Sequence, residues 1–141
     1  MAMTFSELIS LEEAVLCRLL LASEKQLELA RGGNITLLIR HLGQRERLWH
    51  EFEQLEQQLA EHKGILPERR LWTSAEERQM TEAALNRCKE LMEKILANDQ
   101  MSSDTVAEQK QYVEAQIQKV GTTRRVAPEY VRQSKLDNRT A

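Results

Sequence analysis

The chain has 141 residues, which favours a single domain large enough to bury a sizeable core. Hydrophobic residues make up 41% of the chain and aromatic residues only 4%, so the core is expected to consist mainly of aliphatic side chains. The formal net charge of −2 argues against a nucleic-acid-binding protein, whose binding domain would be basic.

The N-terminus carries no basic segment followed by a long apolar run, so no signal peptide is predicted. The longest apolar cluster, residues 19–22, is far shorter than the ~20 residues that a membrane-spanning helix needs. We therefore expect a cytoplasmic protein that does not insert into a membrane.

Residues 4–31 are predicted to form the first helix, capped by Thr4 or Ser6. Apolar residues at three- and four-residue steps give it a broad stripe: Phe5, Leu8, Ile9, Val15, Leu16, Leu19, Leu20 and Leu27. Charged residues are expected outside the stripe: Glu12, Glu13, Arg18, Glu24 and Lys25. The sequence Gly32-Gly33-Asn34 then ends this helix and caps the next. So short a connection predicts an antiparallel helical hairpin.

Residues 35–63 are predicted to form the second helix. Its inner side is expected to carry Ile35, Leu38, Ile39, Leu42, Trp49, Phe52 and Leu59, widened by Leu37, Leu48 and Leu55. Gly64 ends this helix and Pro67 prevents its resumption, so residues 64–73 are expected to be a loop. The loop contains Ile65, Leu66, Leu71 and Trp72, and such apolar residues indicate that it folds over one end of the helices.

Residues 74–121 are predicted to form a long third helix. Thr73 with Glu76, or Ser74 with Glu77, fits a capping box at its start. The apolar stripe becomes thin around residues 98–104, where a fresh helix could begin. No glycine or proline forces a break there, so one continuous helix is favoured over two.

These elements predict an all-α fold, an antiparallel bundle of three to four long helices over residues 1–121. Residues 122–141 are expected to be a flexible tail because they contain Pro128, lack periodicity and are rich in basic residues. The apolar residues Val126, Tyr130 and Val131 could pack back on the bundle or form a short docking motif.

No arrangement of residues indicates catalysis or metal binding, so no enzyme activity and no cofactor are predicted. His41, His50 and His62 all belong to the second helix, and His50 has Arg47 where a helical di-metal site needs glutamate. Cys17 and Cys88 lack the further ligands that a zinc site requires.

The remaining candidate for function is an apolar stripe in the second half of the third helix. It contains four residues that lack evident partners: Val106, Val113, Ile117 and Val120. Such a face is suited to binding a helix of another protein. It could equally pack on the first helix, or on a second copy of this chain in a homodimeric coiled-coil protein.

The order of features resembles the FlgN family of flagellar type III export chaperones. In that family, a first helix with spaced leucines and a glutamate precedes a short turn, and a second helix with L-x-x-L-x-x-x-(K/R)-x-x-L spacing follows. The corresponding residues here are Glu24, Leu27, Gly32-Gly33-Asn34, Leu38, Leu42, Arg45, Leu48, Leu55, Glu56 and Leu59. The segments ELMEKILANDQ and VAEQKQYVEAQIQKV look like the family's long C-terminal helix. FliT-type chaperones of the same export system have a similar layout.

The resemblance implies a chaperone that holds hook-associated proteins soluble and delivers them to the export gate. The C-terminal segments of these client proteins would form amphipathic helices on the third helix, at Val106, Val113, Ile117 and Val120. Family members also dock on the cytosolic domain of the export gate, and Tyr130 occupies the place of a tyrosine that often serves there.

Overall fold

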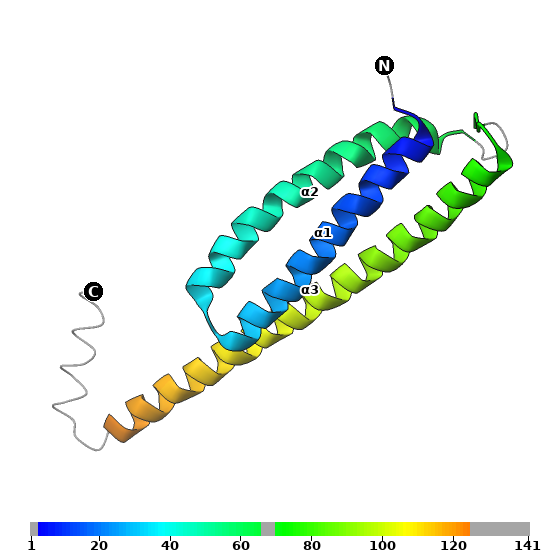
Figure 1. The fold of residues 1–141 in the computed structure, drawn as a ribbon. Helices are drawn as coiled ribbons and strands as arrows, with labels where there is room; N and C mark the ends of the chain where they lie inside the picture. Colours follow the sequence, from blue (N-terminus) through cyan, green and yellow to red (C-terminus); the bar gives the residue numbers. More distant parts are fainter. Residues whose placement is uncertain (1–2, 66–69, 125–141) are drawn as a thin grey trace. The chain divides into compact units, whose positions relative to one another are not determined.

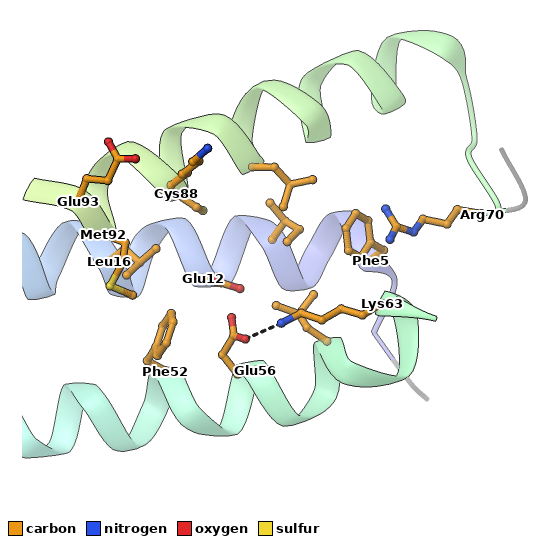
Figure 2. Close-up of a pocket in the computed structure, with 14 residues that line it drawn as sticks. Phe5, Glu12, Leu16, Phe52, Glu56, Lys63, Arg70, Cys88, Met92 and Glu93 are labelled. Carbon is orange, nitrogen blue, oxygen red and sulfur yellow. Dashed lines mark hydrogen bonds and ion pairs between the residues drawn. The ribbon is translucent and has the colours of Figure 1, made fainter. Parts of the chain in front are cut away.

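The computed structural model describes residues 3–65 and 70–124, with side chains described as far as Gly121. The described chain is helical, with three helices: α1 (Phe5–Gly32), α2 (Ile35–Lys63) and α3 (Ala75–Arg124) (Figure 1). It divides into two compact units, Met1–Ser103 and Asp104–Ala141. In the first unit all three helices pack together, and α1 lies between α2 and α3 (Figures 1 and 2).

The ends of α1 and α2 follow the predicted capping residues. Thr4 caps α1, and its hydroxyl oxygen accepts a hydrogen bond from the Glu7 backbone N–H at 3.2 Å. Gly33 ends α1 with a positive φ of 70°, a left-handed conformation that favours glycine. The side chain of Asn34 accepts from the Leu37 N–H at 3.1 Å and so caps α2.

The third helix begins with a modified capping box. The Ser74 hydroxyl oxygen accepts from the Glu77 N–H at 3.0 Å, and the Glu77 carboxylate accepts from the Thr73 N–H at 2.9 Å. From there α3 is a single helix that passes through residues 98–104 without a break and continues to Arg124. It therefore ends three residues beyond Gly121, where the sequence had placed its end. The rest of the predicted tail, including Val126, Pro128, Tyr130 and Val131, lies outside the described residues.

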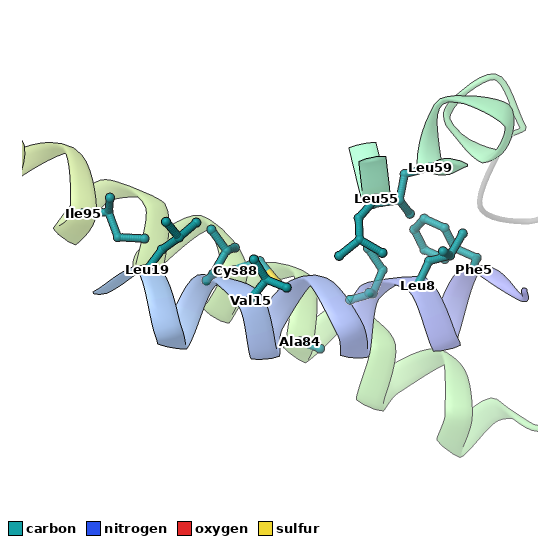
Figure 3. Packing of buried hydrophobic residues seen from close by; sticks show 11 residues of the cluster. Phe5, Leu8, Val15, Leu19, Leu55, Leu59, Ala84, Cys88 and Ile95 are labelled. Atoms are coloured by element: carbon teal, nitrogen blue, oxygen red, sulfur yellow. The ribbon is translucent and has the colours of Figure 1, made fainter. Parts of the chain in front are cut away.

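The core of the first unit is built on the predicted stripe of α1 (Figure 3). Leu8, Leu16 and Leu19 are almost completely buried. They belong to a cluster that draws on all three helices and also contains Phe5, Ile9, Val15, Leu55, Leu59, Ala84, Cys88 and Ile95. Because every helix contributes to one cluster, removing apolar surface from water holds the unit together.

Two predictions about burial are wrong. Ile35, Ile39 and Leu42 of α2 were expected on its inner side, but 50%, 65% and 41% of their surface is exposed, and only Leu38 in that turn is buried. The buried face of α2 follows the predicted Leu38, Leu55 and Leu59 together with Arg45, which puts the three exposed residues on a different side of the helix.

Glu12 was expected outside the α1 stripe, yet it is only 8% exposed. It lies between Ile9 and Leu16 at helical steps of three and four residues, on the face that α2 and α3 cover. The position of Glu12 on the inner face of α1 therefore determines its burial, although the side chain is ionisable.

The loop before α3 covers one end of the helices in part. Trp72 packs edge-on against the Phe5 ring, with 6.1 Å between ring centroids, and the Arg70 guanidinium lies 3.9 Å from the centroid of the same ring. Leu71, in contrast, is 98% exposed. The predicted packing thus holds for Trp72 and not for Leu71, and Leu66 lies outside the described residues.

The polar segment of α3 has partners on the other two helices. Arg45 forms an ion pair with Asp99, with 2.6 Å between Nη2 and Oδ2, and donates to the Gln26 side chain at 2.6 Å. Asn98 donates to the Ser23 hydroxyl at 3.0 Å. These bonds pair part of the polar layer, whereas Arg45 Nε, Asp99 Oδ1 and the Ser102 hydroxyl are buried without a hydrogen-bond partner.

Candidate interaction surfaces

The second unit presents the predicted stripe to solvent. The exposed fractions of Val106, Val113, Ile117 and Val120 are 37%, 54%, 65% and 49%. None of its described side chains, residues 104–121, is buried. Thr105 and Gln109 are half-buried, and the other side chains in this range are exposed. Four aliphatic residues on one side of a helix, all open to water, form a surface suited to another apolar surface. We call these four residues the C-terminal stripe.

A lysine lies within the C-terminal stripe. Lys110 follows Val106 by four residues and precedes Val113 by three, so its side chain leaves the helix on the same face. Lys110 is exposed. A partner that covers the stripe must therefore accommodate one positive charge among the aliphatic side chains.

The exposed aromatic residue Tyr112 was missed by sequence reasoning. It is 66% exposed and adjoins Val113 in the chain, but points to a different side of the helix. Tyr112 does not fit the three- and four-residue spacing of the apolar stripe, so the spacing did not point to it. Because only 4% of the residues are aromatic, an aromatic residue in this helix could have been noticed for its rarity. Tyr130, the predicted contact with the export gate, lies outside the described residues.

A second surface lies in the first unit, where an open groove of about 500 Å³ runs between α2 and α3 (Figure 2). Its floor is a line of α1 residues: Phe5, Ile9, Glu12 and Leu16. Its walls include Phe52, Glu56, Leu59 and Lys63 of α2 and Leu85, Lys89, Met92 and Glu93 of α3. Most of these side chains are apolar, so the groove can accept an apolar partner. We call it the inter-helix groove.

Glu12 is the polar centre of the groove floor. Burial and the neighbouring Glu56 carboxyl raise its pKa from the usual 4.5 to about 7, although Lys63 acts in the opposite direction. Lys63 forms an ion pair with Glu56, with 2.8 Å between Nζ and Oε2. One carboxyl oxygen of Glu12, Oε2, is buried without a hydrogen-bond partner. Near neutral pH, Glu12 is thus balanced between its neutral and charged forms, and a cation entering the groove would favour the charged form.

The groove also contains Cys88, whose chemistry differs from that of a reactive thiol. Burial, together with the nearby carboxylates of Glu12 and Glu13, raises the pKa of Cys88 to about 12. The nucleophilic form of cysteine is the thiolate, which is scarce at neutral pH when the pKa is so high. Cys88 therefore acts as a small apolar side chain in the core.

Across residues 3–65 and 70–124, no group of three or more histidine, cysteine, aspartate or glutamate residues is placed to hold a metal ion. Within the same ranges, no helix combines the length and the apolar character needed to cross a bilayer. Comparison of the chain with models of protein families, with curated proteins and with solved structures finds no match.

Proposed function

We propose that this protein is a cytoplasmic export chaperone of the flagellar type III system that binds the C-terminal helical segments of hook-associated proteins. The observation that carries the proposal is the exposed C-terminal stripe on residues 104–121. The resemblance of the helix order to the FlgN family supplies the choice of client. The proposal includes an antiparallel bundle of three to four helices as the framework that carries the binding surface.

The binding would rest on removal of apolar surface from water. A client helix laid along the stripe covers two valines, an isoleucine and a further valine at steps of seven, four and three residues. Each Å² of apolar surface removed from water contributes about 25 cal/mol. The client loses conformational freedom when it becomes helical, which reduces the net affinity. A binding site of this kind holds a client soluble and still releases it.

Client binding should depend on the four exposed aliphatic side chains of the stripe and not only on the presence of α3. A charge at Val113 or Ile117 would stay in water in the free protein but would be buried against a bound client, so Val113→Asp and Ile117→Asp should abolish binding. Gln111→Asp is a matched control, because Gln111 is exposed and lies on the opposite side of α3. Calorimetry with client C-terminal peptides measures binding, and far-UV circular dichroism checks helix content.

Two outcomes contradict the proposal. If Val113→Asp unfolds the protein, the stripe belongs to a core. If Gln111→Asp weakens binding as much as Val113→Asp, the client does not recognise the stripe. The contact of Tyr130 with the export gate is a separate part of the proposal, tested by Tyr130→Ala, which should weaken gate binding and leave client binding unchanged.

A further inference from the structure

The C-terminal stripe and Lys110 together follow the core spacing of a coiled coil. Val106, Lys110, Val113, Ile117 and Val120 follow one another at steps of four, three, four and three residues. These steps are those of the a and d positions of a helix that packs against one partner helix. All five side chains are exposed, so the face that they form is open to such a partner.

We propose that this face packs against the same face of a second copy of the chain, as an antiparallel two-helix coiled coil of residues 104–121. The two helices would overlap over about 27 Å, at 1.5 Å per residue. The inference concerns the protein alone and does not rest on the proposed client.

The spacing of the face is complementary to itself. Read from either end, the steps from Val106 to Ile117 are four, three and four residues. In an antiparallel pair, Val106 therefore meets the partner's Ile117. Lys110 meets the partner's Val113, and the two-fold axis repeats both contacts. Every layer of this interface contains at least one aliphatic side chain.

The charges select the antiparallel direction. Glu114 is exposed and follows Lys110 by four residues, so it lies at the edge of the face beside the lysine. Antiparallel pairing brings these edges of the two helices together, and Lys110 of each copy then lies beside the partner's Glu114. A parallel pair would instead place Lys110 opposite the partner's Lys110, and would bring the Glu114 edge against the uncharged edge that contains Gln109. Only the antiparallel pair gives both charges a counter-charge.

A second copy fits this face better than an unrelated helix because it brings the spacing and the counter-charge together. Each copy has one such face, so the pair has two-fold symmetry and closes as a dimer without continuing into a filament. The interface is small, with four aliphatic side chains from each copy, so we expect a dissociation constant in the micromolar range. A client that covers the C-terminal stripe would compete with the second copy.

Sedimentation equilibrium of the full chain over a wide range of concentrations tests the dimer. Lys110→Glu and Glu114→Lys should each raise the dimer dissociation constant about tenfold, because each brings like charges together at two symmetric places. Combining the two substitutions restores opposite charges and should return the dissociation constant to within about threefold of the original. Lys119→Glu and Glu108→Lys are matched controls on the opposite side of α3 and should leave it unchanged.

Cysteine cross-linking in a Cys17→Ser background tests the direction of the two helices. A mixture of Val106→Cys and Ile117→Cys chains should form mixed disulfide dimers in a redox buffer, because the two positions meet in the antiparallel pair. Val106→Cys alone should not cross-link, since its two copies would lie about 16 Å apart along the helix axes.

Three results would overturn the inference: a monomer at every concentration, no recovery of the dimer in the combined charge variant, or disulfide dimers of Val106→Cys alone. The substituted positions on α3 are exposed, and far-UV circular dichroism checks that each variant keeps its helix content. A chain that stays monomeric and still binds the client peptide would contradict this inference and leave the proposed function intact.

Discussion

In the part of α3 that belongs to the first unit, residues 75–103, buried positions include the polar residues Thr81 and Ser102, which are 3% and 2% exposed. In residues 104–121 of the same helix, the aliphatic residues Val113 and Ile117 are more than half exposed. Burial along this helix therefore follows the presence of neighbouring helices and not the polarity of each residue. An exposed aliphatic stripe contributes little to folding, which leaves it available for binding.

The sharpest way to test the comparison is to truncate one aliphatic residue in each region. Leu19, with 0% exposure, lies in the core, and Leu19→Ala should lower the free energy of unfolding by about 3–5 kcal/mol because it leaves a cavity. Ile117→Ala should change it by less than about 0.5 kcal/mol at concentrations where the protein is monomeric. Urea unfolding followed by circular dichroism measures both. Similar losses in the two variants would show that the stripe is core.

The helices and their caps could be predicted because they depend on local sequence. Thr4, Asn34 and Ser74 cap through bonds to residues three positions ahead, and the period of apolar residues identified the α1 core. The exposure of Ile39 and the burial of Glu12 depend on which side of each helix its neighbours cover. The apolar period of one helix does not show which of its sides the other helices cover.

One of the two candidate surfaces could be predicted from local sequence, and the other could not. The spacing of Val106, Val113, Ile117 and Val120 identified one exposed surface, and its role in client binding stays a prediction. The inter-helix groove was missed because it needs side chains from all three helices. The line Phe5, Ile9, Glu12 and Leu16 was a readable signal, since a charged residue at an apolar position often marks a special environment.

The polar layer provides a second test, with an intermediate effect. The Arg45 side chain is 8% exposed and that of Asp99 is 28% exposed. Arg45→Ala leaves Asp99 without its counter-ion and should lower the free energy of unfolding by about 2–3 kcal/mol. In an Asp99→Asn background, the same change should cost less, because no unpaired charge remains. Equal losses in both backgrounds, measured by urea unfolding, would show that Arg45 stabilises the protein through packing alone.

The pH dependence of stability tests the burial of Glu12 and has the smallest expected effect. The pKa of Glu12 is about 7 in the folded protein and lies near 4.5 when the side chain is in water. Between these values the folded state keeps a proton that the unfolded chain releases. The stability contributed by this group is therefore complete below pH 4.5, falls as the pH rises and is lost above about pH 7, by about 1–3 kcal/mol.

Glu12→Gln removes the titrating group and should flatten this part of the profile. Thermal unfolding of both proteins between pH 4.5 and 8 measures the difference. A profile that keeps the same slope in Glu12→Gln would show that Glu12 is solvated in the folded protein.

We propose that the protein acts by covering the C-terminal stripe with a helix from another chain. Methyl-resolved NMR tests it directly, by titrating the protein with the C-terminal segment of a hook-associated protein. We expect the methyl signals of Val106, Val113, Ile117 and Val120 to shift while those of the core residues Leu19 and Ile95 stay in place. Unchanged stripe signals in the presence of bound peptide would contradict it.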